Sequence, residues 1–202
     1  MMVKYLWIIS IFLFLNLSQP KKIILFFGDS ITAGHGLTAQ QAFPALVEAQ
    51  FKSQGRSISA INAGLSGETS AGGLSRIDWI LRQPIDIFVL ELGGNDGLRG
   101  LPLEETKKNL QGIIDKVKTK NPNVKIVIAG MMVPPNMGPD YSNDFKTIFP
   151  ELAKKNKAIL IPFLLEGVAG DEKLNLADGI HPNVEGHAQV AKLLVKILAP
   201  LL

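Results

Sequence analysis

Short, continuously apolar segments alternate with segments of helical periodicity along most of this chain. Five of these apolar runs are interpreted as strands, at 22–27, 57–62, 85–90, 124–131 and 158–161. Apolar residues at helical spacing, such as Phe43, Val47 and Phe51, indicate helices between them. Further helices are expected over 74–81, from Pro102 onward, over 141–155 and over 184–198. Strands that are apolar throughout are typical of a parallel sheet covered on both faces by helices, so the sequence predicts an α/β fold.

Length, charge and cysteine content narrow the class of protein. The 202 residues suit one well-packed domain, which we expect over 19–202. The net charge is only +3, and basic residues alternate with acidic ones, as in 104–108, which argues against a nucleic-acid partner. The chain has no cysteine, no His-Glu-x-x-His motif and no Walker loop. We therefore expect no metal site. We also expect a monomeric protein.

The N-terminus differs in composition from the rest of the chain. Lys4 precedes an apolar run over 5–15, which fits a secretory signal peptide better than a membrane-spanning helix. Cleavage after Ser18 would place Asn16, rather than a small residue, three positions before the cut. Residues 1–18 are therefore expected to be a signal peptide or an uncleaved anchor near a membrane, and the protein to be periplasmic or secreted. The alternative is a buried first strand or helix.

Five polar or small residues follow predicted strands or precede the last helix. Ser30, Gly67 and Asn95 come after the first, second and third strands, while Asp178 and His181 lie just before the final helix. Ligands of parallel α/β folds bind beyond the carboxyl ends of the strands. We therefore expect these five residues to converge on one edge of the sheet.

Three of them suit nucleophilic catalysis. A serine hydroxyl needs a neighbouring base, which is usually histidine, and a carboxylate that orients the imidazole ring. Asp178 and His181 are three residues apart, with Gly179 permitting a tight turn between them. The sequence thus predicts Ser30 as nucleophile, His181 as base and Asp178 as its partner.

Attack on an ester creates an oxyanion that preorganised hydrogen-bond donors must stabilise. The expected donors are the backbone N–H groups of Ser30 and Gly67 and the side-chain amide of Asn95. Ser66 is rejected as a nucleophile, because position 68 is glutamate where a Gly-x-Ser-x-Gly elbow needs glycine. His35 is interpreted as an exposed loop residue, or else as part of the site mouth, and His187 as a surface or packing residue.

Four segments resemble the conserved blocks of the SGNH (GDSL-type) hydrolase family. They lie at 27–34 (with Ile31 where the motif has leucine), 62–70, 92–100 and 178–183. The resemblance implies a flavodoxin-like three-layer α/β/α sandwich without a cofactor. It also implies that Gly67 and Asn95 are the family's oxyanion residues. The match over 95–100 and 134–136 is similar to the acyl-CoA thioesterase I, arylesterase and lysophospholipase group, which implies activity on small-molecule or lipid acyl esters and thioesters.

Substrate specificity is expected to depend on residues 97–101 and 131–139. Methionine adapts to irregular shapes, so Met131, Met132 and Met137, with Pro134 and Pro135, are expected to wall an apolar channel. The residues expected to bind substrate are Asp29, Leu98, Met132 and Pro134. The alternative is that these methionines are ordinary core residues at a strand end. Two other functions stay open, a carbohydrate O-acetyl esterase and a non-catalytic exported binding protein.

Overall fold

The computed structural model describes residues 21–202, so the expected signal or anchor segment, 1–18, lies outside the described residues. Five parallel strands form one sheet in the order β2-β1-β3-β4-β5. They are β1 (Lys22–Gly28), β2 (Ile58–Gly64), β3 (Ile87–Glu91), β4 (Lys125–Ala129) and β5 (Ile159–Ile161). This is the flavodoxin-like strand order, and the prediction of a five-stranded parallel sheet is confirmed.

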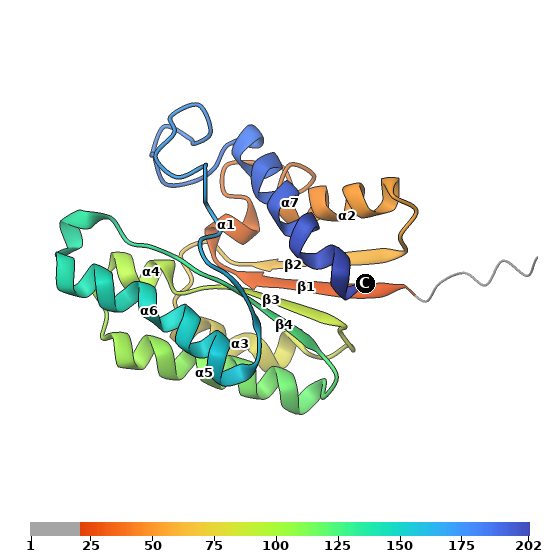
Figure 1. Cartoon of the computed structure of the whole chain (residues 1–202), viewed down its shortest axis with the longest axis horizontal. Coiled ribbons are helices and arrows are strands. Elements are labelled where there is room, and N and C mark those ends of the chain that lie inside the picture. Colours follow the sequence, from red (N-terminus) through yellow and green to blue (C-terminus); the bar gives the residue numbers. More distant parts are fainter. Residues whose placement is uncertain (1–20) are drawn as a thin grey trace, which may run out of the picture.

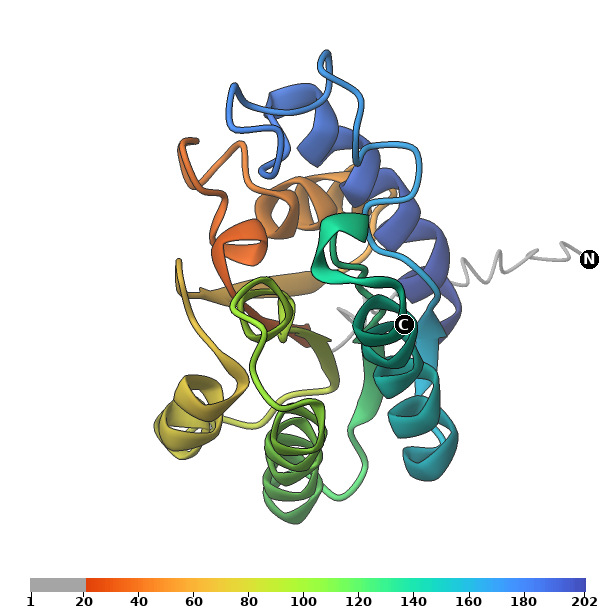
Figure 2. The same ribbon diagram turned by 90° about the vertical axis from the view of Figure 1, so that its left-hand side faces the viewer.

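Helices cover both faces of the sheet (Figures 1 and 2). One face carries α2 (Phe43–Ser53) and α7 (Val184–Leu198). The opposite face carries α3 (Ser70–Ile80), α5 (Leu103–Lys120) and α6 (Pro139–Asn156). Alternate residues of each strand point into the two resulting cores, as a period of two requires. The predicted three-layer sandwich is therefore confirmed.

Several element bounds differ from the predicted ones. Helix α3 begins at Ser70, four residues early, because the Thr69 hydroxyl caps it by accepting a hydrogen bond from the Gly72 N–H. The glycine-rich segment after β3 contains a short helix, α4 (Gly94–Leu98), that the sequence pattern did not predict. Tertiary pairing holds this helix in place, since the Asp96 carboxylate accepts hydrogen bonds from both the backbone and the hydroxyl of Ser70. Three other single turns were not predicted: α1 (Ser30–Ala33), η1 (Pro135–Met137) and η2 (Ala199–Leu201).

The topology creates a crevice at the carboxyl ends of β1 and β3. The chain leaves β1 toward the α2 face but leaves β3 toward the α5 face, and ligands bind at such a switch point. Figure 2 faces this edge of the sheet. Gly28 ends β1 here, and a Cβ atom on it would lie 2.2 Å from the Thr32 hydroxyl, so only glycine fits. Among the described residues, no helix combines the length and apolar character needed to cross a membrane.

Candidate active site

Three of the predicted residues are linked by hydrogen bonds at this edge. Ser30 is the first residue of α1, and its Oγ lies 2.8 Å from His181 Nε2. The other ring nitrogen of His181, Nδ1, lies 2.7 Å from Asp178 Oδ2. Ser30 is only 9% exposed. This arrangement suits the transfer of a proton from the serine hydroxyl to the imidazole.

A tightly turned loop presents His181 to Ser30. Gly179 adopts a φ of +68°, in the left-handed region, which confirms the predicted tight turn. The Asp178 Oδ1 atom accepts hydrogen bonds from the backbone N–H groups of Ile180 and His181, at 2.9 and 3.0 Å. These bonds, with that from the His181 ring, lower the pKa of Asp178 below its usual range. Asp178 therefore stays ionised at neutral pH and can stabilise a protonated His181.

The turn at Ser30 leaves one backbone donor free. Asp29 caps α1 by accepting from the Ile31 N–H, and the Thr32 N–H donates to Glu91. The Ser30 N–H has no acceptor within residues 21–202, and neither has the N–H of Gly67. Both groups remain available to an oxyanion.

Asn95 contacts the residue before Ser30 and the residue after Gly67, so its amide already has partners. Asn95 Nδ2 lies 3.2 Å from Asp29 Oδ2 and 3.0 Å from the carbonyl oxygen of Glu68. For this amide to reach a reacting oxygen, its longer bond, to Asp29, must be shared or exchanged. The sequence placed Asn95 at the site but could not show this competition.

Two buried carboxyl groups, those of Asp29 and Glu91, lie close to the turn that carries Ser30. Burial raises the pKa of Asp29 to about 6, and raises the pKa of Glu91 well above its ordinary value, with the Asp29 charge adding to the effect. Glu91 Oε2 accepts hydrogen bonds from the Thr32 hydroxyl at 2.5 Å and from the Thr32 and Asp29 N–H groups. Sequence reasoning missed Glu91, although a charged residue ending an otherwise apolar strand was a usable signal.

An apolar cavity of about 470 Å³ opens beside the triad, within the size range of small-molecule sites. Leu98, Met132 and Pro134 line it, as predicted. Asp29 is not among its lining residues and is buried in the turn before Ser30, so its expected contact with substrate stays a prediction. Most of the unpredicted side chains in the lining come from α1 and from the long segment between β5 and α7: Ile31, Phe163, Leu164, Leu165, Ala169 and Ile180.

Only some of the residues expected to wall a channel line this cavity, and its use by substrate stays a prediction. Met131 lines the cavity with Met132, whereas Met137 does not, and the side chain of Pro135 lies outside the described part of the structure. The expectation that these methionines serve only as core is not met for Met132, which is 55% exposed.

The two other histidines of the chain differ in their surroundings: His35 borders the triad, whereas His187 is buried in the core. His35 is exposed, as expected, but its ring centroid is only 4.4 Å from that of His181, so it also borders the site. The ligand atoms of His35, Asp178 and His181 all lie within 4.8 Å of one another, close enough to approach one metal ion. Both ring nitrogens of His181 are, however, engaged by Asp178 and Ser30. His187 is buried and accepts the Phe43 N–H, and burial lowers its pKa to about 4, which confirms a packing role.

Known proteins are similar to this chain in sequence and in fold. The chain is 37% identical over 180 residues to a Pseudomonas aeruginosa protein named esterase TesA, with 89% of each chain covered. It is 34% identical over 198 residues to a Vibrio mimicus arylesterase, with 98% of each covered. A crystal structure of TesA superposes with a TM-score of 0.84 at 37% identity, covering 90% of this chain and all of that one.

The psychrotrophic esterase EstA from a Pseudoalteromonas species superposes with a TM-score of 0.83 at 31% identity, covering 89% of this chain and 97% of that one. A family model, described as the GDSL-like lipase/acylhydrolase family, matches residues 26–189, which hold Ser30, the crevice and His181. With relatives this similar over nearly its whole length, the chain belongs to the GDSL-like lipase/acylhydrolase family.

Proposed function

We propose that this protein hydrolyses carboxylic esters and thioesters through an acyl-enzyme on Ser30. The observation that supports it most directly is the pair of short contacts joining Ser30, His181 and Asp178 beside an apolar cavity. Similar proteins named esterase, arylesterase and thioesterase 1/protease 1/lysophospholipase L1 point to the same reaction class.

In the first half-reaction, Ser30 Oγ attacks the acyl carbonyl while His181 Nε2 takes the hydroxyl proton. The carbonyl oxygen becomes an oxyanion, stabilised by the N–H groups of Ser30 and Gly67 and by the amide of Asn95. His181 then gives its proton to the leaving alcohol or thiol, whose bond to the acyl carbon breaks. In the second half, His181 deprotonates water, which attacks the acyl carbon. The bond from this carbon to Ser30 Oγ then breaks, His181 returns the proton to Oγ, and the acid is released.

The cavity favours acyl chains over acetyl groups. Its lining is dominated by aliphatic, methionine and phenylalanine side chains, with Glu91 as the single ionisable residue. Burying each methylene of an acyl chain contributes roughly 0.8 kcal/mol, which is about a fourfold preference. A sugar would find few hydrogen-bonding side chains in this apolar lining, which favours acyl chains over acetylated carbohydrates, and a binding protein would not require the linked triad.

Hydrolysis of p-nitrophenyl acetate, butyrate, octanoate and decanoate by residues 19–202 tests the proposal. We expect kcat/KM to rise with chain length until the cavity is filled, and activity to vanish in Ser30→Ala with an unchanged circular dichroism spectrum. Activity on acetylated sugars alone would favour the O-acetyl esterase. A folded wild-type protein inactive on all of these substrates would indicate a binding protein.

We also propose that the protein is exported, stays close to a membrane if residues 1–18 are not cleaved, and works as a monomer. Lys4 and the apolar run that follows it support export. Fractionation of the native host, with N-terminal sequencing of the mature chain, tests the location. Light scattering of the purified protein tests the oligomeric state. Cytosolic protein beginning at Met1 would contradict the export proposal.

A further inference from the structure

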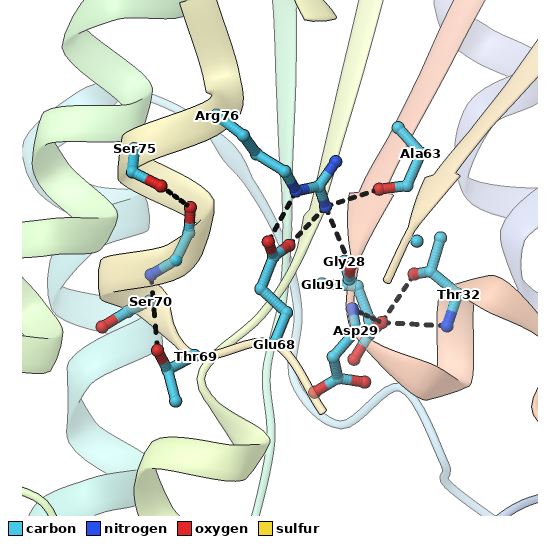
Figure 3. Close-up of polar contacts among 12 residues, drawn as sticks. Gly28, Asp29, Thr32, Ala63, Glu68, Thr69, Ser70, Ser75, Arg76 and Glu91 are labelled. Carbon is cyan, nitrogen blue, oxygen red and sulfur yellow. Dashed lines mark hydrogen bonds and ion pairs between the residues drawn. The ribbon is translucent and has the colours of Figure 1, made fainter. Parts of the chain in front are cut away.

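A largely buried ion pair lies directly behind the loop that carries the Gly67 N–H. Residues Leu65–Glu68 form a tight turn, called here the oxyanion turn, closed by a hydrogen bond from the Glu68 N–H to the Leu65 carbonyl. The Glu68 carboxylate meets Arg76 of α3 in a two-point contact, through Nε at 2.6 Å and through Nη2. The side chains of Glu68 and Arg76 are 3% and 22% exposed. Figure 3 shows this pair.

The Arg76 guanidinium also joins the ends of two strands. Its Nη2 atom donates to the carbonyl of Ala63 in β2 at 2.8 Å and lies 3.5 Å from the carbonyl of Gly28 in β1 (Figure 3). Its central carbon lies 4.2 Å from the centroid of the Phe27 ring, a cation–π distance. One side chain therefore connects the oxyanion turn to the strand that leads into Ser30.

The backbone of Glu68 also positions the side-chain amide of Asn95, the third expected oxyanion donor. Its carbonyl oxygen accepts the hydrogen bond from Asn95 Nδ2 at 3.0 Å. Gly67, the residue just before it, has a φ of +78° and carries the free N–H. A displacement of Glu68 would thus move the Gly67 N–H and the Asn95 amide together, relative to Ser30.

We propose that Arg76 and Glu68 are positioning residues that fix the three oxyanion donors relative to one another. This inference rests on the proposed function. A buried ion pair is by itself weak evidence for stability, since apolar replacements are often neutral. Its bidentate geometry instead sets orientation, which a lysine cannot reproduce because an ammonium is a point charge.

The consequence for kinetics differs from that of a purely structural ion pair. The oxyanion exists only in the transition state, so misplaced donors should lower kcat and leave KM nearly unchanged. A misplacement of about 1 Å in a catalytic arrangement can cost roughly 10²-fold. We expect Glu68→Gln and Arg76→Lys each to lower kcat about 10- to 100-fold.

The experiment measures kcat and KM for p-nitrophenyl butyrate, with active sites counted by complete titration with an organophosphonate. Counting active sites removes the contribution of unfolded protein, so a change in stability alone would not alter kcat. The matched control is Asp78→Asn, in the same helix α3 as Arg76. This change breaks the ion pair of Asp78 with Lys116 of α5, which is far more exposed to solvent than the Glu68–Arg76 pair. This control should keep kcat within about twofold of wild type, as expected of a surface pair.

Combination with Asn95→Ala separates positioning from an unrelated effect. If Glu68 acts through Asn95 and Gly67, the loss in Glu68→Gln/Asn95→Ala should be clearly smaller than the product of the two single losses. Multiplicative losses, or a kcat within about twofold of wild type in both Glu68→Gln and Arg76→Lys, would overturn the inference. An active wild type with unaffected variants would leave the proposed function standing, whereas a folded wild type inactive on the whole series of p-nitrophenyl esters would refute both.

Discussion

Replacing Asp178 by asparagine tests the proposed triad at its most constrained atom. Asp178 Oδ1 accepts two backbone hydrogen bonds, from Ile180 and His181, while Oδ2 faces His181 Nδ1 at 2.7 Å. An asparagine must direct its amide oxygen to one side and its NH₂ group to the other. Directing the NH₂ group at the two N–H donors would lose both backbone bonds, each contributing about 0.5–1.5 kcal/mol. The amide oxygen should therefore stay on the backbone and the NH₂ group should face His181.

This orientation forces the wrong tautomer on His181. Nδ1 must accept from the amide, so the ring proton moves to Nε2, which then cannot take the proton of Ser30. In a serine protease, the corresponding aspartate-to-asparagine change lowers kcat about 10⁴-fold, and we expect a similar loss here. Asp178→Ala should retain more activity than Asp178→Asn. The Asp178 side chain is 38% exposed, so in the alanine variant water can accept the Nδ1 proton and keep the productive tautomer.

The assay is kcat per titrated active site between pH 6 and 9 for wild type and both variants, with ¹⁵N NMR to assign the protonated nitrogen of His181. Because the pKa of Asp178 lies below its usual range, the carboxylate stays ionised throughout and adds no titration of its own. An asparagine variant that keeps more than about one tenth of the wild-type kcat, or exceeds the alanine variant, would refute the tautomer argument.

Three further predictions concern the oxyanion site, a buried histidine and the acyl cavity. Asn95→Ala should lower kcat by about 10²–10³ with little change in KM, and steady-state kinetics showing unchanged turnover in a folded variant would remove Asn95 from the oxyanion site. His187 has its pKa lowered from 6.5 to about 4, so its neutral form stabilises the fold above pH 6.5. This stabilisation should fall by up to about 3 kcal/mol as the pH decreases to 4. The measurement is the free energy of unfolding in urea, as a function of pH, for wild type and His187→Gln. The raised pKa values of Asp29 and Glu91 act in the opposite direction, but they are common to both proteins and cancel in the comparison. Parallel pH profiles of the two proteins would contradict the prediction. Leu165→Trp should narrow the cavity and lower kcat/KM for the octanoate ester. The kcat/KM for the acetate ester should stay within about twofold of wild type, a change of less than about 0.4 kcal/mol. Equal losses on both esters would exclude a role for the cavity in chain-length preference.

The element types and the triad residues were accessible from local sequence. Apolar runs and helical spacing arise from residues within a few positions of one another, so they predicted the sheet and the five main helices. Asp178, Gly179 and His181 lie within one turn, and their mutual contact follows from chain geometry alone. The glycine-rich segment around Asn95 was less accessible, because a helix at Gly94–Leu98 depends on Asp96 meeting Ser70 across the fold.

Tertiary packing decides the strand order, which the sequence suggested only through resemblance to a family. This order brings Ser30 and His181 together although they are 151 residues apart in the chain. Packing also decided which side chains complete the site. Glu91 meets Thr32 only because β3 lies beside β1, and the segment holding Phe163 and Ile180 has no periodicity that would assign it to the cavity. The sequence by itself determined the local elements and the residues capable of chemistry, since both depend on neighbouring residues. Burial, altered pKa values, the cavity and the contacts of Arg76 depend on side chains distant along the chain, so only the tertiary structure decided them.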